Sequence, residues 1–138
     1  MAKFTQDMRD AVEQAKVIAL ATVSEVGEPN VVPIAYKKTL SDADLVLMNI
    51  FMKKTEENIK VNSKVAVSAW YTDTSGISKG YQFKGKARIE TSGKVFDEGI
   101  KMVKVAEPEL SPKSVVIINV DSIYSISPGP NAGKQISW

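Results

Sequence analysis

The sequence of 138 residues contains no cysteine and no histidine. Without cysteine, the chain has no disulfide, no thiolate metal ligand and no cysteine nucleophile. Without histidine, it also lacks the imidazole that Ser-His-Asp and Cys-His catalytic sites, His-ligated haem and the usual zinc sites require. Redox chemistry would therefore have to come from a bound cofactor.

Long apolar runs and clustered charge are missing as well. No segment approaches the roughly 20 apolar residues of a membrane-spanning helix, and the start MAKFTQDMRD lacks the apolar centre of a secretory signal. The net charge is only +2 and lysines are scattered among acidic residues, so the sequence shows no basic stripe for nucleic acid. We expect one cytoplasmic domain over residues 1–138, with no membrane or nucleic-acid partner.

The apolar pattern predicts a mainly β protein. Apolar residues at helical spacing after Phe4, with Thr5 as N-cap, predict an opening helix. EENIKVN and SGKVFDEGIKMVKVA predict two further helices, the second interrupted by Gly99. Short runs bounded by turn residues predict six strands: VIALATV, NVVPIAYK, LVLMNI, KVAVSAWY, GYQFKGKARIET and SVVIINVDSIYSIS. Six strands with peripheral helices predict a β-barrel with α additions.

The stretch FMKKTEENI, from Phe51 to Ile59, joins an apolar strand to a short helix. The unpaired N–H groups and positive dipole at a helix start favour phosphate, and Lys53 and Lys54 add positive charge there. Thr55 has a hydroxyl that could cap the helix or donate to a phosphate oxygen. The alternative is a capped helix start with a solvated lysine face, and the two glutamates that follow would repel an anion if they turned toward it. Local sequence leaves both interpretations open.

Four segments in order resemble the FMN-binding split-barrel family related to pyridoxamine 5′-phosphate oxidase. These segments are IALATVSEVGEPNVVPIAY, LVLMNIFMKKTEENIKVNSKVAVSAW, GYQFKGKARIET and SVVIINVDSIYSIS, and they span roughly Ala15 to Ser127. The resemblance implies a mainly β fold, a six-stranded Greek-key split β-barrel with peripheral α-helices. It also implies a homodimer that holds one FMN in each of two clefts at the subunit interface.

The resemblance assigns candidate cofactor-binding residues on two segments. The phosphate-binding segment of the family falls on Lys53, Lys54 and Thr55. The strand along the isoalloxazine ring falls on Val32, Pro33, Ile34 and Ala35. Because Pro33 cannot donate to a β-ladder, it would leave neighbouring backbone groups free to meet the polar edge of the flavin.

Further candidates come from other parts of the chain. Met48 and Asn49 end the third strand beside the same cleft, and the alternative for Asn49 is a turn residue. Gln82 lies on a strand that in the family contributes from the partner subunit, although an outward polar residue of an alternating strand is an equal alternative. Trp138 ends a glycine- and proline-rich tail, so we expect it to cover a flavin or seal the dimer groove unless the end is disordered. Trp70 is expected to pack in the core or in the interface.

Two residues that the related oxidase uses are missing from the C-terminal segment, and their absence limits the activities that we expect. A pyridoxamine phosphate oxidase uses an arginine and a histidine of its C-terminal segment, whereas PGPNAGKQISW has neither, so vitamin B6 oxidation is not expected. We expect an FMN-dependent oxidoreductase that transfers hydride or electrons from a reduced nicotinamide or other donor to a small substrate. The alternatives are a non-enzymatic FMN carrier or electron-transfer module, the same fold with a deazaflavin, and an apo dimerisation barrel. No catalytic residue and no metal ligand is assigned.

Overall fold

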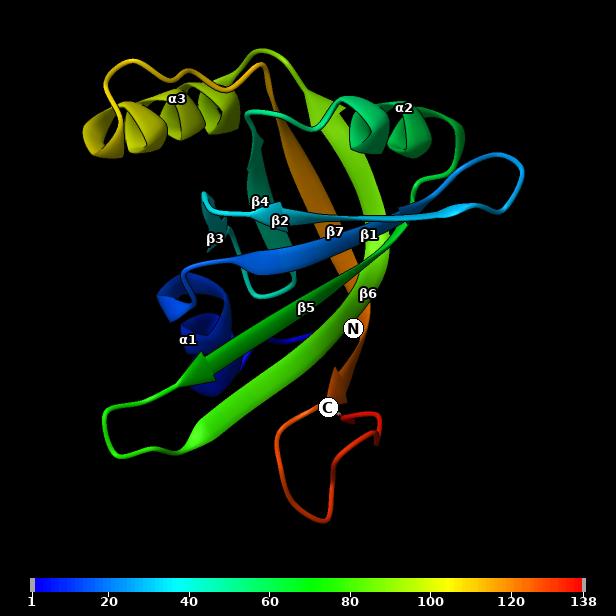
Figure 1. Cartoon of the computed structure of the whole chain (residues 1–138), viewed down its shortest axis with the longest axis vertical. Helices are drawn as coiled ribbons and strands as arrows, with labels where there is room; N and C mark the ends of the chain where they lie inside the picture. Colours follow the sequence, from blue (N-terminus) through cyan, green and yellow to red (C-terminus); the bar gives the residue numbers. More distant parts are fainter. Residues whose placement is uncertain (1, 138) are drawn as a thin grey trace.

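The computed structural model describes residues 2–137 and forms one curled antiparallel sheet with three helices (Figure 1). The sheet order is β2-β1-β5-β6-β7-β4-β3. The strands are β1 (Ile18–Val23), β2 (Pro29–Ile34), β3 (Lys37–Thr39), β4 (Asp44–Asn49), β5 (Lys64–Thr72), β6 (Ser78–Glu90) and β7 (Ser114–Ser125). The helices are α1 (Gln6–Gln14), α2 (Lys53–Val61) and α3 (Lys94–Ala106). The mainly β split-barrel expectation is confirmed.

The predicted strand count of six is wrong, because the structure has seven strands. NVVPIAYK is not one strand: it divides at Ala35 and Tyr36 into β2, which pairs with β1, and β3, which pairs with β4. β2 and β3 therefore form the two opposite edges of the sheet. The chain therefore has to leave one edge and join the other within two residues, and this bend ends the first strand.

The core fills the concave side of the sheet. Leu20, Val67, Phe83 and Ile118 are at most 1% exposed and come from four different strands. Helix α1 packs against β3, β5 and β6, and its predicted cap is confirmed because the Thr5 hydroxyl accepts a hydrogen bond from the Met8 N–H at 3.3 Å. The apolar face of α1 thus covers one opening of the curled sheet.

Helix α3 builds a second, smaller core on β4 and β7. Val103 is buried against a cluster that contains Val46, Met48 and Val115. A Cβ atom at Gly99 would lie only 2.9 Å from the Val115 side chain, so the glycine that interrupts the helical pattern is what lets α3 approach β7. Figure 1 shows α2 and α3 at one end of the sheet and the C-terminal segment at the other.

None of the helices formed by residues 2–137 combines the length and the apolar character needed to cross a bilayer.

Candidate ligand-binding site

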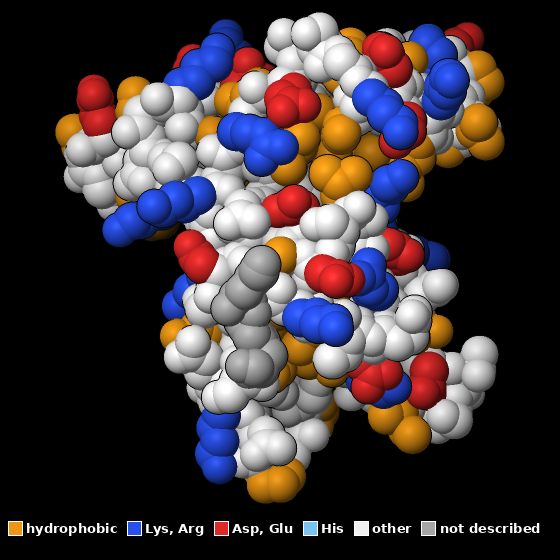
Figure 2. Space-filling view, turned by 180° about the vertical axis from the view of Figure 1, so that it is seen from behind, with side chains coloured by type: hydrophobic (Ala, Val, Ile, Leu, Met, Phe, Trp, Pro, Cys, Tyr) orange, Lys and Arg blue, Asp and Glu red, His pale blue; other side chains and the backbone are white. Residues whose placement is uncertain are grey.

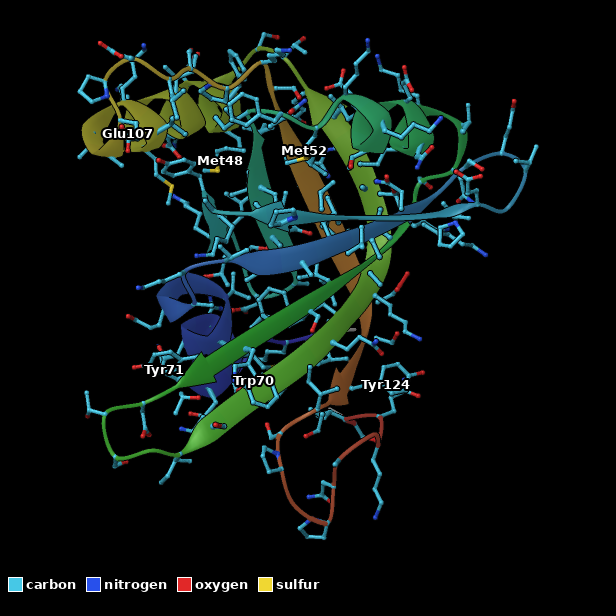
Figure 3. All side chains as sticks on the ribbon, viewed as in Figure 1. Met48, Met52, Trp70, Tyr71, Glu107 and Tyr124 are labelled. Carbon is cyan, nitrogen blue, oxygen red and sulfur yellow. The ribbon has the colours of Figure 1, made fainter. Side chains whose placement is uncertain are left out.

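The two edge strands of the sheet, β2 and β3, are consecutive in the chain but carry no ladder between them in the described residues. We call this gap, bridged by Ala35 and Tyr36, the seam. A hollow of about 240 Å³ opens at the seam, and we call it the apolar hollow. Its lining residues are Val32, Pro33, Ile34, Ala35, Tyr36, Met48, Ile50, Phe51, Met52 and Leu110. Met48 and Met52 enter from β4 and from the start of α2 (Figure 3).

The apolar hollow brings together five of the residues assigned from the resemblance: Val32, Pro33, Ile34, Ala35 and Met48. None of the ten lining residues is a lysine, arginine, aspartate or glutamate. Phe51 stands at the rim with 84% of its surface exposed. Such a lining suits a planar, mainly apolar group, with polar contacts supplied by the backbone.

Pro33 supplies that backbone polarity. It lies opposite Ala19 of β1 and has no N–H, so its nitrogen must face away from the β1 ladder. Backbone groups of alternate residues in a strand face the same side, so the Pro33 carbonyl and the polar groups of Val31 also face the open edge. The edge that proline protects from further strand pairing is therefore available to a ligand.

A second hollow of about 190 Å³ adjoins the first through Met52, and we call it the lysine hollow. Its lining residues are Asn49, Met52, Lys53, Glu56, Glu57, Lys60 and Lys113. Lys53 and Lys54 are both exposed in the first turn of α2, where backbone N–H groups have no intrahelical partner. An apolar hollow and a positively charged helix start thus lie side by side.

Asn49 fixes the turn between the two hollows. The side chain is 2% exposed, its Oδ1 accepts from the Met52 N–H at 2.8 Å, and its Nδ2 donates to Glu56 at 2.5 Å and to the Ser114 hydroxyl at 3.0 Å. Its ligand contact stays a prediction, whereas its role in the turn is visible. The Glu56 carboxylate is held on one side by Asn49 and Ser114, while its side chain stays 24% exposed, lines the lysine hollow and pairs with Lys60.

Thr55 does not cap α2, and that prediction is wrong. The helix begins at Lys53, with Met52 as N-cap and no side-chain capping bond. Thr55 is fully buried, and its hydroxyl accepts a hydrogen bond from Asn30 Nδ2 at 3.1 Å. The threonine therefore ties α2 to β2, while Lys53 and Lys54 face solvent.

Three predicted residues, Lys54, Thr55 and Gln82, are not among the lining residues of these hollows. Gln82 shares a row across the sheet with Pro33, Ala19 and Ser68, on the convex face. Three strand spacings separate Gln82 from Pro33, which is roughly 14 Å. Gln82 could meet the apolar hollow only from a second copy of the chain. Trp138 lies outside the described residues.

Sequence reasoning missed several lining residues, among them Ile50, Phe51, Leu110 and Lys113. Ile50 and Phe51 adjoin the predicted motif and could have been included by position. Leu110 and Lys113 lie in the breaker-rich connection between α3 and β7, which has no periodic pattern that could place it.

The comparisons with known proteins concern the family and the fold of the chain. The family model described as pyridoxamine 5′-phosphate oxidase matches residues 4–127. An uncharacterized protein of Methanocaldococcus jannaschii is 34% identical over 138 residues, which cover 98% of this chain and 89% of that protein. The crystal structure of HupZ from Group A Streptococcus is 30% identical, with a TM-score of 0.76 over 94% of this chain and 99% of that chain.

An FMN-binding protein from Syntrophomonas wolfei shares the fold with a TM-score of 0.77 over 88% of this chain and 84% of that chain, at 18% identity. At this identity the likeness shows a shared fold only. The family match and the more similar relatives show similarity of sequence as well. Together with the seven-stranded curled sheet, they identify the chain as a member of the pyridoxamine 5′-phosphate oxidase family.

Proposed function

We propose that this protein binds FMN and uses it as a flavin-dependent oxidoreductase. One observation carries the proposal: an apolar hollow at an open strand edge adjoins a lysine-bearing helix start, and the two meet at Met52. FMN has the matching two ends, a planar ring system with a polar edge and a phosphate monoester with a charge of about −1.5 to −2.

The residues present fit such a ligand. Val32, Pro33, Ile34 and Ala35 would form the wall beside the ring, with backbone groups of the β2 edge meeting its polar rim. Lys53 and Lys54 would meet the phosphate, together with the free N–H groups of the first turn of α2. The bound flavin would supply hydride or electron transfer from a reduced nicotinamide to a small substrate.

The protein's own contribution would be binding and orientation. The ten residues around the apolar hollow include no carboxylate and no amine, and the Tyr36 phenol is the one side chain among them that could exchange a proton with a substrate. We assign no catalytic residue. The side chains exclude water from the ring and fix which of its edges faces the seam.

A second copy of the chain would complete the site. The convex face beside β2 exposes 50% of Val17, 67% of Val31 and 50% of Trp70, which is unusual for large apolar side chains on one face. These residues surround a further hollow of about 350 Å³ that shares Val32 and Pro33 with the apolar hollow. A partner seated there would cover this face and could bring its own Gln82 toward the flavin.

The dimer is tested by mass in solution. Light scattering should give about twice the 15.1 kDa of one chain, and Trp70→Asp should shift the protein toward the single-chain mass. Val105→Asp introduces the same charge at an apolar residue of α3 that is 87% exposed, and serves as a control for general surface effects. A wild-type protein that runs as a single chain at micromolar concentration would contradict the dimer.

An electron carrier without an organic substrate is the second candidate. The absence of a carboxylate and of an amine among the residues of the apolar hollow favours it, because one-electron transfer needs no general acid or base. Addition of NADPH separates the two functions, since only the oxidoreductase should bleach the bound flavin at a useful rate. The absorbance spectrum of the purified protein distinguishes FMN from a deazaflavin or haem.

The central test compares FMN with riboflavin, which lacks the phosphate. Lys53→Gln combined with Lys54→Gln should weaken FMN binding by about 10- to 100-fold and leave riboflavin nearly unchanged, because only phosphate contacts are lost. Titration of protein with either ligand, followed by flavin fluorescence, gives both dissociation constants. A wild-type protein that binds neither ligand would refute the flavin assignment.

A further inference from the structure

The connection between α3 and β7 lines both hollows, as the turn before α2 does. Leu110 reaches the apolar hollow and Lys113 the lysine hollow. The segment is held firmly: Pro112 is buried, the Lys113 N–H donates to the Asn49 carbonyl at 2.9 Å, and the Ser114 hydroxyl donates to Glu56 at 3.0 Å. Figure 1 shows this connection crossing the end of the sheet that carries α2. Residues from two distant parts of the chain thus build one pair of hollows.

The charges around the lysine hollow are not balanced. Lys54 pairs with Glu57 at 3.8 Å, and Lys60 pairs with Glu56 at 3.3 Å. Lys53 and Lys113 have no carboxylate within 4.0 Å among residues 2–137. Figure 2 shows lysine and acidic side chains interspersed over this end of the molecule. The lining holds three lysines against two glutamates, a net charge of +1, and Lys54 beside it on α2 raises this to +2, which complements a phosphate monoester dianion.

We propose that Lys113 is a phosphate-binding residue of this protein, and that with Lys53 it holds the dianionic end of the ligand from opposite walls of the lysine hollow. The proposal rests on the proposed function for the identity of the ligand and adds a residue that the helix-start motif does not contain. Lys113 is suited to the role because its backbone is fixed by the Asn49 carbonyl, while no carboxylate of residues 2–137 lies within 4.0 Å of its ammonium group. If Lys113 were only a solvated surface residue, its substitution would not change the affinity for FMN relative to riboflavin.

The experiment measures the dissociation constants of FMN and riboflavin for four variants. Lys113→Gln should weaken FMN about 10-fold and riboflavin less than 2-fold, because one charge-assisted contact is lost. Lys60→Gln is the matched control, since it removes the same charge from a lysine of the same hollow that already pairs with Glu56. It should weaken FMN less than 3-fold. Lys113→Arg retains the charge and should stay within 3-fold of the wild type, and Lys53→Gln reports on the opposite wall.

Two results overturn the proposal for Lys113: an effect on FMN no larger than that of Lys60→Gln, or equal weakening of FMN and riboflavin, which would mean an effect through the fold. If Lys53→Gln alone changes the ratio of the two constants, the proposed function stands and only Lys113 is misassigned.

Inorganic phosphate gives an independent readout by NMR. Amide shifts of both Lys53 and Lys113 on phosphate addition, in a protein that binds no flavin, would support the lysine pair and refute the FMN assignment. The absence of both shifts and of FMN binding would refute both.

Discussion

The apolar hollow and the lysine hollow adjoin at Met52, yet they are built in opposite ways. The apolar hollow has walls of strand backbone and short or apolar side chains on the two sides of the seam. The lysine hollow is lined by long side chains such as Lys60, which is 65% exposed. The difference means that recognition of a ring and recognition of an anion depend on separate residues. Substitutions should be able to change one without the other, except where a residue supports both.

Asn49 is the residue that supports both hollows, so its loss should have the largest effect. Asn49→Ala removes three hydrogen bonds, leaves the Met52 N–H without its side-chain acceptor and takes from the Glu56 carboxylate one of its two buried donors. We expect a decrease of about 3 kcal/mol in the free energy of unfolding, measured with urea, and weaker binding of FMN and riboflavin alike. Asn119→Ala is the control, because Asn119 is exposed and makes one bond, to Asp44 at 2.8 Å. Equal losses for the two variants would contradict the role of Asn49.

A carboxylate in the apolar hollow should break ring binding alone. Val32→Glu introduces a charge into a wall that has no basic side chain, so FMN and riboflavin should both bind about 10- to 100-fold more weakly, with their ratio unchanged. Val26→Glu adds the same charge in the β1–β2 turn, where the side chain is 84% exposed, and should have no effect. Retention of riboflavin by Val32→Glu would mean that the ring binds elsewhere.

Thr55 tests whether a buried hydroxyl behind α2 contributes to anion binding. Thr55→Val keeps the shape but removes the acceptor of the Asn30 amide, so we expect a loss of about 1 kcal/mol in unfolding free energy. The ratio of FMN to riboflavin affinity should stay constant because the hydroxyl does not face solvent. Selective weakening of FMN would instead support a direct phosphate contact by Thr55, as the sequence motif suggested.

Substitution of Lys37 should have the smallest effect on stability and no effect on ligand binding in either hollow. Its ammonium group donates to the Ala15 carbonyl, and burial lowers its pKa below 10.5, partly offset by the Glu13 carboxylate. Between the lowered pKa and 10.5 the unfolded chain binds more protons than the native protein, so the native state gains stability as pH rises through that window. The difference in unfolding free energy between wild type and Lys37→Met should therefore shift in favour of wild type with rising pH. A pH-independent difference would contradict the lowered pKa.

The sequence allowed the fold class and one wall of the site to be predicted, because both depend on local pattern. Alternation predicted the strands, and the odd position of Pro33 indicated a free edge. The break at Ala35 and Tyr36 could not be predicted. It arises because β2 pairs with β1 and β3 pairs with β4, at the two opposite ends of the strand order. The helix start was misplaced because Thr55 has good capping chemistry, whereas Asn49, which fixes the turn through the Met52 N–H, belongs to a strand.

The opposite wall of the candidate site could not be predicted from local sequence patterns, for a physical reason. Leu110 and Lys113 lie in an irregular connection whose path is determined by contacts with α2 and β4, not by its own backbone preferences. Interactions between segments this far apart appear only once the chain has folded.

The seam has a consequence for how such a protein adapts. Along most of the sheet, the distance between neighbouring strands is fixed by hydrogen bonds at about 4.8 Å. Between β2 and β3 no ladder sets that distance, so side chains alone determine how wide the opening is. A few substitutions there can widen or narrow the entrance for a ligand of different thickness without disturbing any strand pair. The seam is therefore the most adaptable part of an otherwise rigid scaffold.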